Sequence, residues 1–121
     1  MQAEGRVVIF SGPADADNSY AAPQRVEVPS VNGQAVITVV AKDENGNPVV
    51  DGTVVHAATE VGILDATEKG TVGGVATFTI MTSTDPSSPT PTGTYHAYFS
   101  VERGKGMLPL QLPPVEISVV D

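Results

Sequence analysis

The sequence predicts an all-β chain folded as an antiparallel two-sheet sandwich of about seven strands. Val and Thr are abundant among its 121 residues, and these side chains pack well on a pleated, half-buried surface. Short apolar or alternating runs are separated by Gly, Pro, Asn and Asp. No stretch shows the 3.6-residue apolar period of a helix, which excludes a parallel α/β fold. Many short strands with frequent turns are typical of a two-sheet sandwich.

Turn chemistry divides the first half of the chain. Residues 14–19 are polar and predict a loop, and prolines at positions 23 and 29 mark the strand between them as an edge strand. The next run is more continuously apolar, as expected of a central strand, and Asn45-Gly46 predicts the turn after it. Strands are expected at residues 6–10, 24–28, 35–41 and 53–58.

The second half continues the pattern. Residues 84–93 are rich in Pro, Ser and Thr and predict an exposed loop, and residues 107–114 form an apolar connection broken by proline. A short segment at 62–64 and a polar link at 67–70 precede the strands expected at residues 75–81, 94–101 and 115–120.

Side-chain alternation predicts the core. In the strand at 75–81, Ala76, Phe78 and Ile80 share one face, which we expect to be the buried one. The large side chains that we expect to be buried are Phe78, Tyr95, Phe99, Val36 and Ile117.

Length, charge and cysteine content narrow the function classes. The 121 residues fit one domain, spanning residues 1–121, which we expect to be a module excised from a longer multi-domain protein. A net charge of -8 opposes nucleic-acid binding. No apolar run approaches the ~18 residues of a membrane helix, so direct membrane insertion is not expected. Zero Cys excludes disulfides and thiolate metal sites.

Four short blocks carry a family resemblance. They are Asn32-Gly33-Gln34, Asp43-x-x-Gly46-Asn47-Pro48-Val49, Gly73-Gly74-Val75-Ala76-Thr77 and Gly93-Thr94-Tyr95. In this order and approximate spacing, from Ser30 to Val101, they resemble the bacterial Ig-like domains of the invasin and intimin type (bacterial Ig-like domain group 1). The longer proline-rich loop at 82–92 and the insertion at 107–114 depart from the pattern of that family.

The resemblance implies an Ig-like β-sandwich that serves as a tandem repeat module. Such modules form rods, spacers and adhesins in bacterial cell-surface or secreted proteins, so we expect a non-catalytic structural or adhesive unit located outside the cell. Its expected partners are neighbouring Ig-like modules of the same chain and a host or surface protein or glycan. The first five residues lack the basic and apolar regions of a signal peptide, so the export signal is expected outside this chain.

Two alternative functions stay open. A carbohydrate-binding or accessory module of a glycan-active enzyme would need exposed aromatic rings, for which only Tyr20 and Tyr98 are available. An Ig-like decoration domain of a phage virion is a further alternative, for which the sequence holds no discriminating feature.

The sequence predicts neither an enzyme nor a cofactor. It has no Gly-x-Ser-x-Gly, no His-Glu-x-x-His and no P-loop, so we expect no catalytic, cofactor-binding or metal-binding residue. Two acidic loops begin like calcium loops, at Asp15-x-Asp17-x-Ser19 and Asp43-x-Asn45-x-Asn47. Both lack the glutamate at the twelfth position, so we interpret these side chains as turn-stabilising.

A pair of histidines forms one candidate binding patch. We expect Val55 and Ala57 on one strand, and Tyr95, Ala97 and Phe99 on another, to point inward, which turns His56 and His96 outward. Because these strands are neighbours in an Ig-like sheet, the two His and Tyr98 would lie together as a weak metal-binding or pH-sensitive patch. The favoured interpretation is two exposed histidines without a carboxylate partner.

Overall fold

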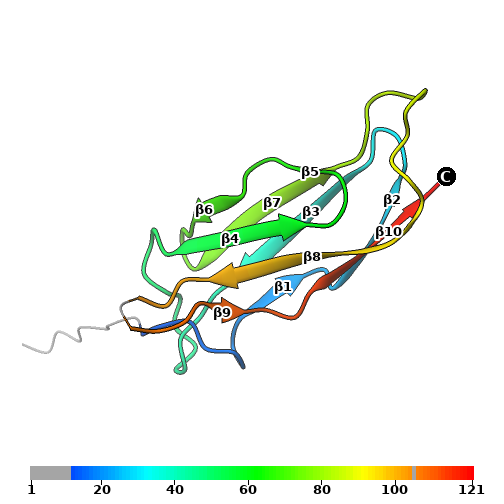
Figure 1. Cartoon of the computed structure of the whole chain (residues 1–121). Helices are drawn as coiled ribbons and strands as arrows, with labels where there is room; N and C mark the ends of the chain where they lie inside the picture. The colour runs from blue at the N-terminus through cyan, green and yellow to red at the C-terminus, as the bar shows by residue number, and fades with distance from the viewer. Residues whose placement is uncertain (1–11, 105) are drawn as a thin grey trace, which may run out of the picture.

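A computed structural model describes residues 12–104 and 106–121, and every regular element in this part of the chain is a β-strand. The strands form two sheets packed face to face (Figure 1). The predicted all-β sandwich is therefore confirmed. The strand expected at residues 6–10 lies outside the described residues. Among the residues that the structure describes, a membrane-spanning helix is absent.

The smaller sheet has four strands in the order β1-β3-β7-β5. Its centre is the antiparallel pair of β3 and β7, in register from Gln34 opposite Met81 to Val40 opposite Val75. The bounds are β1 Tyr20–Ala22, β3 Gln34–Val40, β5 Ile63–Leu64 and β7 Val75–Met81.

The larger sheet has the order β2-β10-β8-β4-β6, and β9 pairs with β8 beside this path. Within the described residues, β2 and β10 pair in parallel, with Arg25 opposite Glu116 and Pro29 opposite Val120, whereas the other pairs of named strands are antiparallel. The bounds are β2 Arg25–Pro29, β4 Val54–Thr59, β6 Glu68–Gly70, β8 Gly93–Val101, β9 Leu110–Gln111 and β10 Val115–Val120.

The core lies between the two sheets. Phe78 from the smaller sheet and Phe99 from the larger one are both buried, with ring centroids 5.6 Å apart and planes tilted by 50°. Ile117 is also buried, so these three core predictions are confirmed. The predicted inward face of β7, with Ala76, Phe78 and Ile80, is confirmed as well.

Two of the expected core residues are placed differently. Val36 is 52% exposed, because β3 is central within its sheet but only one face of that sheet contacts the core. Its neighbours Ala35 and Ile37 take the buried positions. Tyr95 is half-buried against the core, and its hydroxyl donates to the carbonyl of Pro91, 3.0 Å away.

Three short strands were not expected. β1 follows the loop at 14–19, β6 occupies the polar link at 67–70, and β9 interrupts the connection at 107–114. Each has two or three residues and exists because a longer strand lies beside it: β3, β4 and β8 respectively. Segments this short carry no periodic signal of their own.

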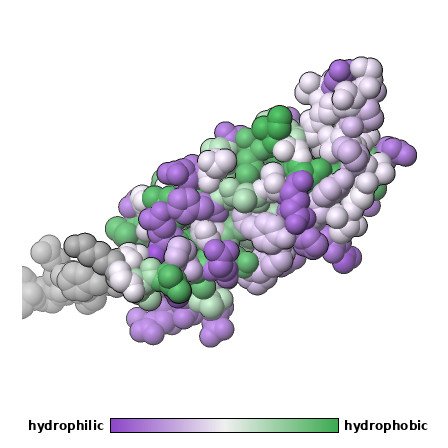
Figure 2. Space-filling model, viewed as in Figure 1, coloured by the Kyte–Doolittle hydropathy of each residue, from purple (hydrophilic) through white to green (hydrophobic). Residues whose placement is uncertain are grey.

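The chain passes from one end of the sandwich to the other. The first described residues and the C-terminus lie at opposite ends of an elongated molecule, here termed the N-terminal and C-terminal poles (Figure 1). The Pro-, Ser- and Thr-rich loop at 84–92 projects beside the C-terminus (Figure 1). Its pale colour in Figure 2 indicates residues of intermediate hydropathy. The loop expected there is confirmed.

Candidate functional site

The outward face of β4 and β8 holds the histidines that the sequence singled out. Val55 and Ala57 point into the core from β4, as do Ala97 and Phe99 from β8. His56 and His96 therefore face outward, each with a side chain 42% exposed. In Figure 2, polar and apolar side chains are interspersed over this face.

The strand register separates the two histidines. His56 lies opposite Ser100, and Tyr98 lies opposite Ala58. His96 is four residues before Ser100 on β8, which places it roughly 13 Å from His56 along the sheet. The prediction that the strands are neighbours is confirmed, but the register does not place the two imidazoles side by side.

Each histidine has a carboxylate partner, contrary to the expectation. On β8, the backbone N–H of His96 donates to Glu60 Oε1 at 2.8 Å, and the Tyr98 hydroxyl donates to Glu60 Oε2 at 3.0 Å. The imidazole Nδ1 of His96 lies 3.6 Å from Glu60 Oε1. The His96 N–H and the Tyr98 hydroxyl lower the pKa of Glu60, and the bond to Glu60 raises the pKa of Tyr98.

The second pair joins His56 to Glu102. Their Nε2 and Oε2 atoms are 2.5 Å apart, and both side chains are about half exposed. Sequence reasoning missed Glu60 and Glu102 because both lie just past the end of a strand. Continuing the outward alternation from His56 to Glu60, and from His96 to Glu102, would have found them.

A shallow hollow of about 170 Å³ lies between His56 and Tyr98. Ala58 and Ser100 form part of it, because these small side chains alternate with the two larger ones across the strands. Over the described residues, no three His, Asp or Glu side chains are grouped in a way that would hold a metal ion. The face thus offers two exposed histidine–carboxylate pairs and one aromatic ring.

The two acidic loops meet at the N-terminal pole. Asp43 is buried, and its Oδ1 accepts the backbone N–H groups of Asn45 at 3.0 Å and Asn47 at 2.9 Å. Its Oδ2 accepts the N–H of Gly12 at 3.0 Å, and the bonds from Gly12 and Asn47 lower the pKa of this carboxyl. Asp15 accepts the N–H of Asp17 at 3.1 Å. These contacts support a turn-stabilising role for both aspartates.

The block from Asp43 to Val49 packs against the Gly73-Gly74 turn. The N–H of Ala41 donates to the carbonyl of Gly74 at 2.7 Å, and a side chain on Gly74 would meet Pro48. Two of the sequence blocks therefore meet in one structural unit at the N-terminal pole.

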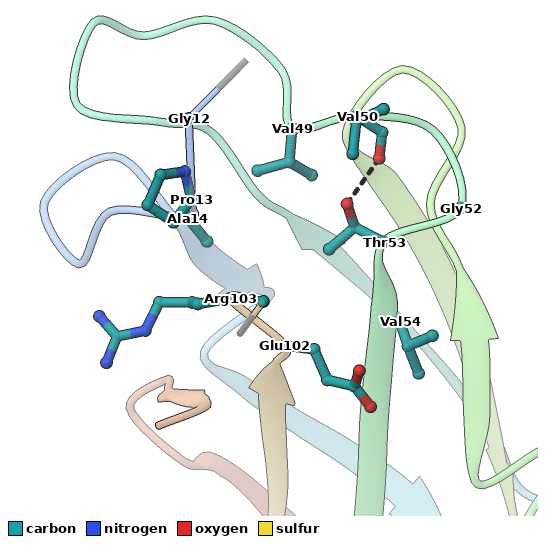
Figure 3. Close-up of a pocket in the computed structure, with 11 residues that line it drawn as sticks. Gly12, Pro13, Ala14, Val49, Val50, Gly52, Thr53, Val54, Glu102 and Arg103 are labelled. Atoms are coloured by element: carbon teal, nitrogen blue, oxygen red, sulfur yellow. Dashed lines mark hydrogen bonds between the residues drawn. The ribbon is translucent and has the colours of Figure 1, made fainter. Parts of the chain in front are cut away.

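A larger hollow, of about 410 Å³, opens at the same pole (Figure 3). Pro13 and Ala14 come from the first described segment, and Val49 and Val50 from the turn before β4. Val50 is 66% exposed, and its carbonyl accepts the Thr53 hydroxyl at 2.6 Å (Figure 3). The lining is therefore mixed: Pro13 and Val50 form an apolar part of the rim, whereas Glu102 and Arg103 form a charged part (Figure 3).

Solved structures of bacterial adhesins share this fold. The adhesin InvE of Yersinia pseudotuberculosis aligns with a TM-score of 0.63 and 29% identity, over 90% of this chain and 28% of that one. The D00-D0 domains of intimin align with a TM-score of 0.56 and 21% identity, over 97% of this chain and 51% of that one. A 282-residue C-terminal fragment of intimin aligns with a TM-score of 0.53 and 20% identity, over 82% of this chain and 31% of that one. That fragment was solved in complex with the intimin-binding domain of the translocated intimin receptor. No protein-family model matches the sequence, and no curated protein does.

Proposed function

Since this chain has the bacterial Ig-like fold of the invasin and intimin type, as its sequence predicted, we propose that it is a non-catalytic spacer or presenting module of a bacterial cell-surface or secreted protein. The chain spans only part of the adhesin structures that it matches: 28% of InvE and 51% of the intimin D00-D0 structure. We also propose that it is joined to neighbouring modules of the same type in one longer chain.

The observation that carries the proposal is the path of the chain. It enters at one pole and leaves at the other (Figure 1), so modules joined end to end would extend rather than fold back. The parallel pair of β2 and β10 runs along this axis and couples the first part of the chain directly to its last strand. Tension between the two ends would thus pass through five residue pairs.

The hollow at the N-terminal pole supports the same arrangement. The apolar part of its rim, with Val50 and Pro13, lies where the chain enters the module (Figure 3). A preceding module in the same chain would meet this rim first, because covalent connection holds it there at high effective concentration.

The proposed module can also be adhesive, by taking part in the binding of a receptor. The matched intimin fragment is in complex with a receptor domain. We propose that this module either contacts a host or surface protein itself or holds another module that does so, outside the cell.

The exposed histidine–glutamate pairs do not favour catalysis. His56 pairs with Glu102 rather than with a hydroxyl or thiol, and the pair is half exposed beside a shallow hollow rather than in a cleft. A nucleophile or general base needs a reacting group oriented next to it in a cleft. We propose that both histidine pairs are solvated surface pairs, of which each stabilises the fold little.

The geometry also argues against the carbohydrate-binding alternative. Tyr98 is 42% exposed on the outer face of the larger sheet, and Tyr20 is 47% exposed on β1 of the smaller sheet. The two rings lie on different sheets, so they do not form a common stacking platform. One ring gives one stacking contact, which is too little to hold a glycan tightly against the cost of association.

A glycan-binding experiment separates the two functions. We expect the isolated module to give no saturable signal on a broad glycan array or in titration with soluble oligosaccharides. The contrary result is glycan binding with a dissociation constant at or below about 100 μM, lost in Tyr98→Ala and retained in Tyr20→Ala. This result would contradict the spacer function and support the accessory-module function. Tyr20→Ala is the matched control, because it removes an equally exposed ring from the other sheet.

A further inference from the structure

Two Asn-Gly pairs lie between strands of this chain, Asn32-Gly33 before β3 and Asn45-Gly46 after it. In such a pair the backbone nitrogen of the glycine attacks the side-chain carbonyl carbon of the asparagine, because glycine has no side chain to obstruct the approach. A bond forms between this nitrogen and that carbon. The glycine proton and the side-chain NH₂ group leave as ammonia, which gives a cyclic succinimide. Water then opens the ring at either carbonyl, so the products are aspartate and isoaspartate.

Gly33 is held through both its N–H and its carbonyl by Thr82. Its N–H donates to the buried Thr82 hydroxyl at 2.7 Å, and its carbonyl accepts the Thr82 N–H at 3.0 Å. The same hydroxyl donates to the carbonyl of Pro29 at 2.8 Å. A Cβ on Gly33 would lie 2.5 Å from that carbonyl oxygen, so the segment is tightly packed here. Attack on the Asn32 side chain therefore requires a buried hydrogen bond to open.

The second Asn-Gly pair is open to solvent. Asn45 and Gly46 are both exposed, and a Cβ on Gly46 would meet no heavy atom within 4 Å. The Gly46 N–H donates to the carbonyl of Asp43 at 3.0 Å in a surface turn, where hydrogen bonds open at little cost in free energy. Asn45 contacts Asp43 through its backbone N–H rather than through its side chain. The nitrogen of Gly46 is therefore far easier to release than that of Gly33.

The two remaining asparagines of the sequence are poor sites for the same reaction. Asn47 precedes Pro48, whose nitrogen carries no hydrogen to lose. Asn18 precedes a serine, Ser19, which is buried, and the Asn18 side-chain Nδ2 donates to the carbonyl of Asp43 at 2.9 Å. Both the nucleophile and the side-chain amide are thus restrained at Asn18.

We propose that Asn45 is the site at which this chain deamidates, with water as the co-reactant, whereas Thr82 protects Asn32. The isoaspartate product lengthens the backbone by a methylene group between positions 45 and 46. Asp43 Oδ1 accepts the N–H groups of Asn45 and Asn47, at 3.0 and 2.9 Å, so its two bonds lie on either side of the added group. Isoaspartate therefore loosens this turn at the N-terminal pole, whereas aspartate changes only the charge.

Incubation of the module at mildly alkaline pH, followed by peptide mapping with mass spectrometry, tests the site. Conversion at Asn45 should be at least about 10-fold faster than at Asn32, because only the latter requires a buried hydrogen bond to open. Equal rates, or a faster rate at Asn32, would overturn the proposal. The variant Asn45→Ser should lack the fast conversion, and its persistence would place the reaction at another residue and contradict the proposal.

Two measurements test the protection of Asn32. Thr82→Val removes the hydroxyl that accepts the Gly33 N–H, and it should speed conversion at Asn32 at least about 10-fold while leaving the rate at Asn45 unchanged. An unchanged rate at Asn32 in the folded variant would contradict the role of Thr82. The second measurement needs no variant: in urea, the rates at the two pairs should become similar. A difference that persists in urea would show that the local sequence, and not the fold, sets the rates.

The variant Asn45→Asp separates the added charge from the lengthened backbone. It carries the same charge as the aged protein but keeps the normal backbone of the turn. The aged protein should therefore have a lower melting temperature than Asn45→Asp. Equal melting temperatures would contradict the proposed loosening of the turn at the N-terminal pole.

Discussion

Phe78→Ala is expected to lower the free energy of unfolding by about 3 to 5 kcal/mol. The Phe78 side chain is fully buried at the centre of the sandwich, 5.6 Å from the Phe99 ring in centroid distance. Its removal leaves a cavity between two sheets whose strands are held in register on both sides, so the space cannot close. Urea unfolding followed by far-UV circular dichroism measures the loss.

Val36→Ala is the matched control for Phe78→Ala. Val36 lies on the adjacent strand but is 52% exposed, so its truncation should cost less than about 1 kcal/mol. A loss below about 1 kcal/mol in Phe78→Ala would contradict the core assignment, and so would equal losses in the two variants.

Gly74→Ala is expected to cost at least about 2 kcal/mol. Gly74 has a φ of +78°, which strains any residue with a side chain. A Cβ there would also lie 2.7 Å from the carbonyl oxygen of Ala41 and 2.9 Å from the Cβ of Pro48. The added methyl group therefore pushes the Gly73-Gly74 turn away from the Asp43–Val49 block. Thermal and urea unfolding both report the change.

Gly73→Ala separates backbone strain from the clash. Gly73 also has a positive φ, of +61°, but a Cβ there would meet no heavy atom within 4 Å. Its substitution should cost only about 1 kcal/mol. Equal losses of unfolding free energy in Gly73→Ala and Gly74→Ala would contradict the prediction, because they would show that the close packing of Gly74 against Pro48 does not stabilise the fold.

Alternation predicted most of the fold because each sheet has one face on the core. The inward residues of β7 follow directly from their spacing, as do the outward positions of His56 and His96. Val36 shows where the reasoning failed: the strand at 35–41 is continuously apolar and central, and we expected Val36 to be buried there, but it lies on the outer face. A strand can be central in its sheet and still expose every second side chain.

The pairing of strands that are distant in the chain could not be predicted from the sequence. The parallel alignment of β2 with β10 joins residues about 90 positions apart, and nothing in either segment specifies the direction of pairing. The same limit applied to the histidines, because a register cannot be read from one strand alone. Glu60 and Glu102, which lie just past strand ends, became partners of His96 and His56 only once the register was known.

Two of the four sequence blocks that carry the family resemblance have a structural role rather than forming a binding site. Asp43 binds three backbone N–H groups, and Gly74 lets the next turn approach Pro48 closely. Both features maintain the N-terminal pole. A resemblance built on such residues therefore predicts the fold well and the ligand poorly.

Mechanical unfolding tests the central claim that this module transmits tension between its poles. Because β2 and β10 are parallel, pulling on the two ends of the chain slides them past each other, and the bonds between their five residue pairs bear the load together. Pulling from a cysteine at position 29, introduced as Pro29→Cys, and from the C-terminus instead peels β10 from β2, because Pro29 lies opposite Val120. The chain has no other cysteine, so this attachment point is unique. In single-molecule force spectroscopy we expect the end-to-end geometry to need clearly the higher unfolding force; an equal or lower force than in the peeling geometry would contradict a spacer built to carry load along its axis.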